Sequence, residues 1–288
     1  MTEHKTVRVN SLWRLRPFKR ASCSRWWSAV VLMGALALTL TQTLRRDWHS
    51  NLDLLACRES VLSVSHALYI NLERRLDRKN SIERQLSSAD IPFHAVQAVD
   101  VSNDAALLRK CWGNSSIDLG RCAGQIGCKY SHIEALERAV LLSWETVAIF
   151  EDDFVWNNHT NPKLVQGAIR QIIQAVGNWD VIAISLNIIK HEPLINVSDI
   201  RIGENQWASV TKIYDAQTTH GYFVRRGYIS KILRAFENCD VQRGYWTAID
   251  TCWKSLQRAD NWFGLDPQLG TQAPGFSDIE KQSVAYDI

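Results

Sequence analysis

The chain has 288 residues, of which 46% are hydrophobic and 22% charged, so it is long enough for one large or two smaller globular domains. The net charge of +3 is unevenly spread, because residues 1–25 hold seven basic side chains against one acid, which leaves −3 for residues 26–288. Nucleic-acid binding needs an excess of Lys and Arg to neutralise phosphates, and the body of the chain lacks it. We therefore exclude nucleic acid as a partner.

The basic segment is followed by nineteen uncharged residues, 26–44, which match the roughly 20 residues that a helix needs to cross a bilayer. The excess of Lys and Arg before this segment places the N-terminus in the cytosol. We expect a type II single-pass membrane protein with a cytosolic basic tail (1–25), a transmembrane signal anchor (26–44), a stem (45–64) and a lumenal domain (65–288). A cleaved signal peptide, with residues 35–37 as the cleavage site, is the alternative. Both readings deliver the body of the chain to the secretory lumen.

Two further features agree with a lumenal body. Three N-glycosylation sequons begin at Asn114, Asn158 and Asn196, all after the predicted anchor. Of the seven cysteines, Cys23 precedes the anchor and six follow it, which permits up to three disulfides in any of fifteen connectivities. The cysteine spacings do not resemble those of paired zinc-knuckle ligands. We expect the Golgi as the compartment, with the endoplasmic reticulum as the alternative.

After the stem, the hydrophobic pattern alternates between strands and helices, without internal repeats or a Pro-rich linker. The predicted elements in chain order are a strand at 66–71, a helix at 77–91, a strand at 93–100, a helix at 127–143, a strand at 146–150, a helix at 163–176 and a strand at 179–186. This alternation indicates an α/β fold with a mostly parallel central sheet. In such sheets, ligands bind beyond the carboxyl ends of the strands.

The predicted strand at 146–150 runs directly into three carboxylates, Glu151, Asp152 and Asp153. Two carboxylates about 4 Å apart repel each other by roughly 4 kcal/mol near a protein surface, so a cluster of them favours a cation. Mn²⁺ and Mg²⁺ take carboxylate oxygens together with substrate phosphates. The motif predicts a metal ion that holds a nucleotide diphosphate; a solvated acidic loop is the alternative for the motif alone.

Several segments carry a family resemblance through their order and spacing. They are LYINLERRLDRKNSIERQL, FHAVQAVD, GQIGCKYSHIEALERAV, VAIFEDDF, HGYFVRRGYISKIL, AIDTCWKSL and DPQLGTQAPGFSDI. Together they cover about 215 residues and resemble glycosyltransferase family 25, which includes bacterial lipopolysaccharide galactosyltransferases and animal collagen galactosyltransferases. One departure from the family pattern is Leu186-Asn187, where relatives commonly carry a glycine, and it leaves the acceptor side open.

The resemblance implies a GT-A type nucleotide-diphospho-sugar transferase fold. It also implies an inverting transfer of a sugar, with galactose as the first candidate, from a UDP-sugar to a hydroxyl of a glycan or glycoprotein acceptor. Mn²⁺, or Mg²⁺ in its place, is the implied cofactor. The implied partners are the nucleotide sugar, this acceptor and the membrane that holds the N-terminal helix.

The resemblance also implies residues that bind the donor. Asn71 ends the first strand at the nucleotide, and Arg75 and Arg78 are placed for the uridine or the diphosphate, which guanidinium groups suit through their forked donors. Ser131 and His132 belong to the family's Gly-Cys-x-x-Ser-His pattern. We expect this pattern at a helix N-terminus, where free backbone N–H groups favour an anion or a polar sugar group.

The three carboxylates match the family's version of the Asp-x-Asp metal motif. The match implies Asp153 as the direct metal ligand, with Glu151 and Asp152 in contact with the metal or the donor. An inverting transfer also needs a base for the acceptor hydroxyl, and the candidates in family-like motifs are Asp250 and Asp278. We prefer Asp250 as the base.

Some assignments remain alternatives at this level. His220 is a candidate for contact with the donor phosphate or the metal, and a structural role is equally consistent with the sequence. Aromatic faces stack on sugar rings, and the candidates in the acceptor half are Trp207, Trp246, Trp253 and Trp262, although most buried tryptophans belong to the core. The alternatives to a glycosyltransferase are a non-catalytic lumenal or surface binding protein with the same fold, and a nucleotidyltransferase.

Overall fold

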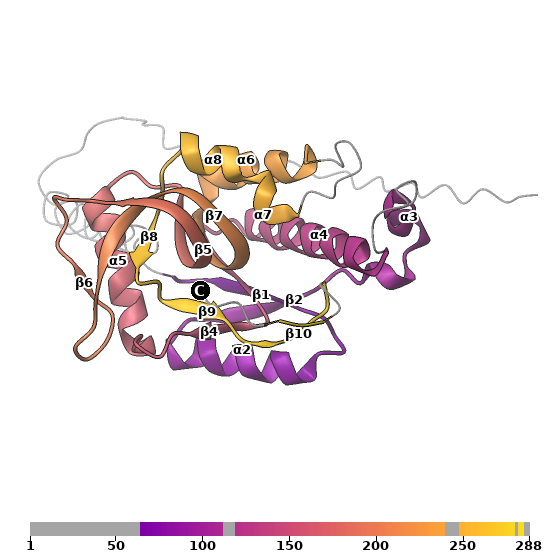
Figure 1. Cartoon of the computed structure of the whole chain (residues 1–288), viewed down its shortest axis with the longest axis horizontal. Coiled ribbons are helices and arrows are strands. Elements are labelled where there is room, and N and C mark those ends of the chain that lie inside the picture. Colours follow the sequence, from indigo (N-terminus) through magenta and orange to yellow (C-terminus); the bar gives the residue numbers. More distant parts are fainter. Residues whose placement is uncertain (1–63, 112–118, 240–247, 280–281, 285–288) are drawn as a thin grey trace, which may run out of the picture. The chain divides into compact units, whose positions relative to one another are not determined.

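A computed structural model describes the chain in four stretches (Figure 1), namely residues 64–111, 119–239, 248–279 and 282–284. The predicted tail and signal anchor, together with nearly all of the predicted stem, lie outside them. Among the described residues, no helix combines the length and the apolar character that a bilayer crossing needs. The sequon residues Asn158 and Asn196 are exposed, and the third sequon at Asn114 lies outside the described residues.

A seven-stranded mixed sheet forms the centre of this domain, with the order β2-β1-β3-β7-β5-β8 and with β6 beside β7. Its strands are β1 (Ala67–Asn71), β2 (Phe93–Gln97), β3 (Thr146–Glu151), β5 (Val181–Pro193), β6 (Ile200–Arg201), β7 (Trp207–Arg225) and β8 (Trp262–Asp266). All of them run in one direction except β7, which pairs antiparallel with each of its neighbours. The prediction of an α/β fold with a mostly parallel sheet is confirmed.

Helices cover both faces of the sheet (Figure 1). They are α2 (Leu76–Ser88), α3 (Ala105–Leu108), α4 (Leu119–Leu141), α5 (Val165–Val176), α6 (Arg226–Glu237), α7 (Ile249–Cys252) and α8 (Lys254–Ala259). Helices α2 and α5 pack on one face, whereas α4 and α6 pack on the other. The result is a three-layer arrangement with one hydrophobic core on each side of the sheet.

The alternation of side chains along the strands builds these two cores. In β1, Ala67 and Tyr69 face the core under α2 and α5, and Leu68 and Ile70 face the core under α4 and α6. Both sets are buried, which explains why β1 reads as a continuous apolar run. Each fully buried aliphatic side chain of this kind contributes about 1.5–3 kcal/mol.

Two elements extend well beyond their predicted bounds. Helix α4 begins at Leu119 rather than at 127. The sequence did not predict its first two turns, because they are rich in glycine and lack a clear apolar stripe. The short apolar cluster that holds these turns contains Cys122 and Ile126. Strand β5 continues past residue 186 to Pro193, where it pairs with the first half of β7 and its side chains become mostly exposed. Neither extension has the regular pattern of apolar residues from which helices and strands are predicted.

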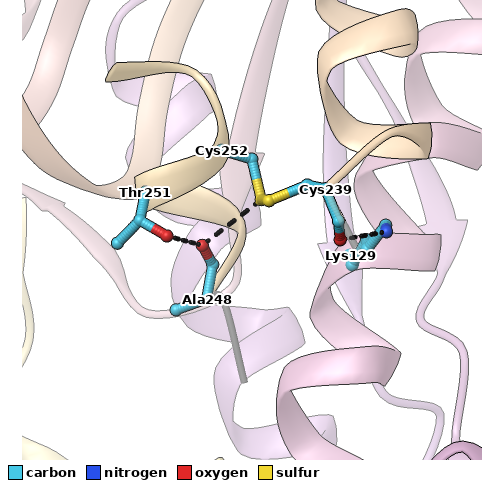
Figure 2. The surroundings of a disulfide bond; sticks show 5 residues. All are labelled: Lys129, Cys239, Ala248, Thr251 and Cys252. Atoms are coloured by element: carbon cyan, nitrogen blue, oxygen red, sulfur yellow. Dashed lines mark hydrogen bonds between the residues drawn. A yellow bond between two sulfur atoms is a disulfide. The ribbon is translucent and has the colours of Figure 1, made fainter. Parts of the chain in front are cut away.

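Two disulfides stabilise the α4 side of the domain. Cys111 pairs with Cys122, and Cys239, which follows α6, pairs with Cys252 of α7. Figure 2 shows the second disulfide and the hydrogen bond of 2.9 Å from Lys129 Nζ of α4 to the carbonyl oxygen of Cys239. Disulfides are typical of an oxidising compartment, as the sequence predicted.

The C-terminal segment closes one side of the domain with short strands. These are β9 (Gly270–Gln272), which pairs with β4 (Phe154–Trp156), and β10 (Gly275–Ser277), which pairs with β11 (Gln282–Val284). The residues that follow β10 lie directly against α4, since a Cβ atom on Gly124 would be 2.7 Å from the Cα atom of Ile279. Helix α4 and the C-terminal segment thus approach each other at a glycine.

Two glycines in helices offer a matched test of how closely α4 packs against the loop after β2. A Cβ atom on Gly127 of α4 would lie 2.6 Å from the carbonyl oxygen of Val99, whereas Gly167 of α5 has no neighbour within 4 Å of that position. Alanine is favoured over glycine by about 1 kcal/mol in a helix, and overpacking costs typically about 1–3 kcal/mol. We expect Gly167→Ala to raise and Gly127→Ala to lower the free energy of unfolding, measured by urea denaturation. Equal effects of both substitutions would contradict the close contact at Gly127.

Candidate functional site

A cleft with a volume of about 350 Å³ lies at the carboxyl ends of β1 and β3. Its walls come from the loop between β1 and α2, one face of α4, the start of α7 and the C-terminal segment. Strand β7 crosses the same edge because its Gly221 pairs with Phe150 of β3, so the residues just before Gly221 also enter the cleft. The cleft lies where the sequence predicted a ligand site.

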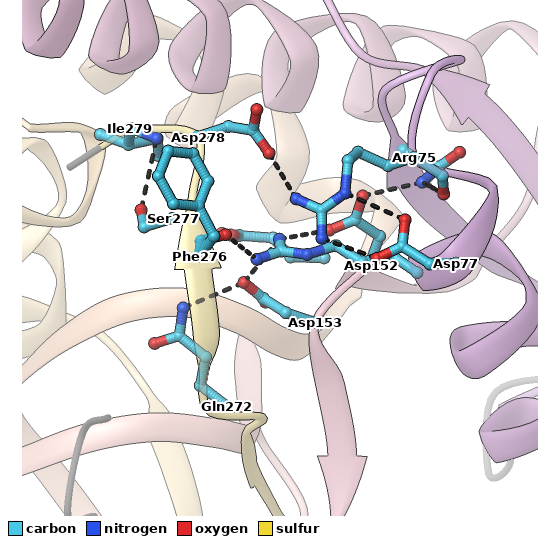
Figure 3. Close-up of polar contacts among 12 residues, drawn as sticks. Arg75, Asp77, Asp152, Asp153, Gln272, Phe276, Ser277, Asp278 and Ile279 are labelled. Atoms are coloured by element: carbon cyan, nitrogen blue, oxygen red, sulfur yellow. Dashed lines mark hydrogen bonds and ion pairs between the residues drawn. The ribbon is translucent and has the colours of Figure 1, made fainter. Parts of the chain in front are cut away.

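Asp153 has one carboxylate oxygen that is held and one that is free. Its Oδ2 atom accepts hydrogen bonds from Arg78 Nη1 at 3.0 Å and from Gln272 Nε2 at 3.0 Å (Figure 3). Its Oδ1 atom is buried, and no described residue donates to it. A buried carboxylate oxygen without a partner is costly, so this atom is well placed for a cation.

Asp152 has a hydrogen-bond partner on each of its carboxylate oxygens. It accepts hydrogen bonds from Asn71 Nδ2 at 2.8 Å and from Arg78 Nη1 at 2.9 Å. Burial and the adjacent charge of Asp153 raise the pKa of Asp152 to about 6, against the opposing effects of Arg78 and Asn71. Asn71 therefore acts on the site through Asp152.

Glu151 ends β3 between two histidines. Burial alone would raise its pKa, but the hydrogen bonds from His132 and Thr219 and the proximity of His220 lower the pKa to about 2. The Nε2 atom of His132 lies 3.3 Å from Glu151 Oε1, and Thr219 Oγ1 donates to the same oxygen. Glu151 is therefore an ionised carboxylate held in a fixed orientation.

Three ligand atoms converge beside these carboxylates. One oxygen each of Glu151 and Asp153 and a ring nitrogen of His220 lie within 4.8 Å of one another. The Nδ1 atom of His220 is buried and has no partner among the described residues. Two carboxylates and an imidazole suit Mn²⁺ and related divalent ions. The residues therefore fit the metal that the sequence predicted, with His220 as an added ligand.

The arginines after β1 face the C-terminal segment. Arg75 pairs with Asp77 and with Asp278, whose Oδ2 is 2.6 Å from Arg75 Nη1 (Figure 3). Arg74 Nη2 lies 2.9 Å from Asp278 Oδ1. Arg78 also donates to the carbonyl oxygen of Phe276 at 2.8 Å. Arg74 and Arg78 line the cleft, whereas Arg75 and Asn71 lie behind its wall.

The ion pairs of Asp278 have a consequence for stability. Burial raises the pKa of Asp278, but the hydrogen bonds and charges of Arg74 and Arg75 outweigh it and lower the pKa. A carboxylate whose pKa is lowered in the folded state stabilises the protein above the ordinary carboxyl pKa of about 3.9. This stabilisation is lost as the pH falls through the lowered pKa. We expect Asp278→Asn to reduce the free energy of unfolding at pH 7 by about 1 kcal/mol.

This difference from wild type should be smaller at pH 3 than at pH 7, because the stabilisation declines once the pH falls below the ordinary aspartate pKa of about 3.9. Urea denaturation of both proteins at the two pH values measures it. Asp90→Asn is the matched control, because Asp90 pairs with Lys163 on the surface with 73% of its side chain exposed. A constant difference at both pH values would show that the ion pairs do not account for it.

Asp250 offers a second free carboxylate oxygen in the cleft. It lies in α7, and its Oδ2 accepts a hydrogen bond of 3.0 Å from the backbone N–H of Thr218, whose φ of 65° is unusual for a β-branched residue. Its Oδ1 is buried without a partner among the described residues. Of the two predicted base candidates, Asp250 keeps a free oxygen, whereas both oxygens of Asp278 are paired with arginines.

Ser131 and His132 line the cleft, but the reason given for them from the sequence is wrong. Because α4 begins at Leu119, both residues lie in the helix interior, where backbone N–H groups are already bonded. Ser131 Oγ donates to the carbonyl oxygen of Gly127 at 2.6 Å and accepts from Val99 N at 2.8 Å. Ser131 therefore fixes the loop after β2 to the helix.

Other residues of the cleft were not selected from the sequence. Arg74, Thr219 and Gln272 line it and contact the charged groups described above. Arg74 is adjacent to the predicted Arg75, so the basic run itself was the available signal. Thr219 and Gln272 belong to strands without a distinctive pattern, and only tertiary contacts identify them.

The predicted sugar platforms fall into three groups. Trp253 and Trp262 are fully buried and pack edge to face with each other, so they belong to the core, which was the alternative to sugar contact for these two candidates. Trp207 is 58% exposed at the start of β7. Trp246 lies outside the described residues. The described cleft contains no tryptophan.

Sequence comparison with known proteins finds matches in one family. The family model described as "Glycosyltransferase family 25 (LPS biosynthesis protein)" matches residues 64–253, about two thirds of the chain. A protein of Aedes aegypti named "Glycosyltransferase 25 family member" is 26% identical over 129 residues, which are 42% of this chain and 21% of that protein. The chain thus corresponds to about a fifth of the length of this relative.

Two solved structures show a loose overlap with the chain. A UDP-glucose pyrophosphorylase complexed with UDP-glucose has a TM-score of 0.39 and 9% identity, over 71% of this chain and 90% of the other. A glycosyltransferase involved in the glycosylation of the major capsid of PBCV-1 has a TM-score of 0.39 and 10% identity, over 75% of this chain and 95% of the other.

Proposed function

This chain belongs to glycosyltransferase family 25, and on that premise we propose that it is a metal-dependent inverting transferase of GT-A type. The proposed reaction moves a sugar, with galactose as the first candidate, from a UDP-sugar to a hydroxyl of a glycan or glycoprotein. One observation carries the proposal. Within the cleft, one oxygen each of Glu151 and Asp153 and a ring nitrogen of His220 lie within 4.8 Å of one another, as a divalent ion requires, and Asp153 Oδ1 and His220 Nδ1 have no partner among the described residues.

Glu151, Asp153 and His220 are the proposed ligands of Mn²⁺ or Mg²⁺. The Oδ2 atom of Asp153 is bound to Arg78 and Gln272, which leaves the unpartnered Oδ1 for the ion. A divalent ion in this place neutralises the charge that develops on the leaving diphosphate. His132 fixes the orientation of Glu151, and its other ring nitrogen lies 3.0 Å from Tyr222 Oη.

Arg74 and Arg78 are the proposed cationic contacts of the diphosphate. Both line the cleft, and Arg78 lies beside the proposed ion site. Guanidinium groups bind phosphate oxygens with two parallel hydrogen bonds at fixed charge. Arg75 is a positioning residue in this scheme, because its pairs with Asp77 and Asp278 hold the loop after β1.

Asp250 is the proposed base for the acceptor hydroxyl. Its free Oδ1 atom is buried at the edge of the cleft, and its other oxygen is held by the N–H of Thr218. A base with one oxygen fixed and one free can accept a proton from a hydroxyl within hydrogen-bonding distance. An inverting transfer needs this base on the side of the sugar opposite the diphosphate.

We further propose a lumenal location, with the Golgi as the first candidate. The two disulfides support an oxidising compartment. The exposed sequon residues Asn158 and Asn196 are accessible to glycosylation there. The signal anchor at 26–44 and the membrane as a partner remain predictions from the sequence.

A donor screen tests the proposed function. The full chain is incubated with Mn²⁺, a mixed glycan acceptor and one UDP-sugar at a time, and released UDP is measured. We expect UDP release with one donor, dependent on the metal. Release of pyrophosphate from a sugar phosphate and UTP would instead indicate nucleotidyl transfer. Binding of UDP without any turnover would indicate the non-catalytic binding protein.

A further inference from the structure

The cleft contains a second set of converging ligand atoms, which the proposed transfer does not use as a set. The thiol of Cys128, a ring nitrogen of His132 and an oxygen of Glu151 lie within 4.8 Å of one another. Cys128 and His132 are four residues apart in α4 and therefore share one face of the helix. Glu151 approaches this face from the end of β3.

The spacing of these atoms is close to that of a tetrahedral zinc site. Ligand atoms at the usual bond lengths of zinc lie about 3.5 Å apart, and His132 Nε2 is 3.3 Å from Glu151 Oε1. The sulfur atom lies within 4.8 Å of the other two ligand atoms, and a shift toward them completes that geometry. Cys128 is free to do so, because its sulfur makes no disulfide with any described cysteine.

The orientation of the ligands is already fixed by their neighbours. The Nδ1 atom of His132 is 3.0 Å from the hydroxyl of the buried Tyr222, so the ring directs Nε2 toward Glu151. The hydroxyl of Thr219 donates to Glu151 from the other side. Zinc-binding histidines commonly have such a partner on the second ring nitrogen, which sets the tautomer and the ring angle.

The chemistry of this set differs from that of the proposed manganese ligands. A thiolate favours Zn²⁺, whereas Mn²⁺ and Mg²⁺ favour carboxylate oxygens. When zinc binds, the thiol proton of Cys128 is released to solvent and a sulfur–zinc bond forms. The thiolate and the carboxylate of Glu151 then balance the two charges of the ion.

We propose that Cys128, His132 and Glu151 bind Zn²⁺ in the cleft, with water as the fourth ligand. The site takes a soft divalent ion and is separate from Asp153 and His220. Because Glu151 belongs to both sets, zinc should oppose the binding of Mn²⁺. That consequence rests on the proposed function, whereas zinc binding itself does not.

Cobalt spectroscopy tests the site without measuring activity. The full chain is freed of metal with a chelator and titrated with Co²⁺, which occupies zinc sites and absorbs in the near ultraviolet when a thiolate coordinates it. We expect this thiolate-to-cobalt band, and we expect Zn²⁺ to displace it. The band should be lost in Cys128→Ser and in Cys128→Ala, with an unchanged circular dichroism spectrum as the check on folding.

Asp153→Asn is the matched control, because it alters the proposed manganese site and leaves the thiol set intact. This variant should keep the cobalt band. No band in wild type, or a band that persists in Cys128→Ser, would overturn the zinc site. If the band is absent while Mn²⁺ still strengthens UDP binding, the zinc site is wrong and the proposed function stands. If the band is present but Mn²⁺ has no effect on UDP binding, the zinc site stands and the proposed function is wrong.

Discussion

Replacing Asp153 with asparagine should lower sugar transfer by at least about 100-fold, since a catalytic metal ion supplies several kcal/mol of charge stabilisation. The substitution keeps the shape of the side chain and an oxygen for Arg78 or Gln272, which now bind Oδ2 at 3.0 Å. It removes the charge and the buried Oδ1 that has no described partner. UDP release at saturating Mn²⁺ and donor measures the loss.

The control for this variant is Asp90→Asn, which removes an exposed carboxylate outside the cleft. We expect that protein to retain wild-type activity. Asp153→Asn should be at least as stable as wild type, because it removes a buried carboxylate oxygen that has no described partner, while Arg78 keeps its pair with Asp152. Full activity in Asp153→Asn would rule out Asp153 as a metal ligand, whereas lower stability would reveal a structural role.

Replacing Asp250 with asparagine should lower kcat by about 100- to 10,000-fold, the range that general bases contribute. The amide oxygen of asparagine can still accept the hydrogen bond from Thr218 N, which Asp250 Oδ2 now accepts at 3.0 Å. The variant therefore separates basicity from positioning. Single-turnover transfer, measured with saturating donor and acceptor, is the required observation.

Binding of UDP should remain unchanged in Asp250→Asn, because the proposed diphosphate contacts lie at Arg74 and Arg78. Asp250→Ala provides the second comparison, since it also removes the hydrogen bond to Thr218. If the asparagine variant is fully active and only the alanine variant is impaired, Asp250 is a positioning residue. Asp278→Asn should then be examined as the alternative base.

The sequence predicted the elements that have a clear apolar run or an apolar face. Strands β1 and β3 and helices α2 and α5 follow the expected pattern, because the two strands bury apolar side chains in both cores and the two helices bury an apolar face in one. The family assigned from the motifs is also confirmed. Strand β7 was missed, since buried and partly buried residues follow one another irregularly along its 19 residues and its direction is set by pairing with β3 and β5.

The candidate site was predicted only where charge is conspicuous in the sequence. Glu151, Asp152 and Asp153 stand out after an apolar strand, and the structure places them in the cleft. Thr219 and Gln272 carry no such signal, because their role arises from contacts across 68 and 119 residues of sequence. Polar residues of ordinary type become part of a site only through the fold.

Cys128 shows the same limit. The sequence offered six cysteines after the predicted anchor and left their pairing open, and the spacing gave no sign of a metal site. The structure pairs four of them and leaves Cys128 beside His132 and Glu151. The ligand set combines a helix face with a strand end, and this combination follows from packing rather than from spacing.

The central claim is that a divalent ion at Glu151, Asp153 and His220 holds a nucleotide diphosphate. Calorimetric titration of the full chain with UDP, with and without Mn²⁺, tests it most directly. We expect Mn²⁺ to strengthen UDP binding by at least about tenfold, within the usual range of coupling between two ligands, and we expect Asp153→Asn to abolish this gain. Equal affinity for UDP in the presence and absence of Mn²⁺ would contradict the claim.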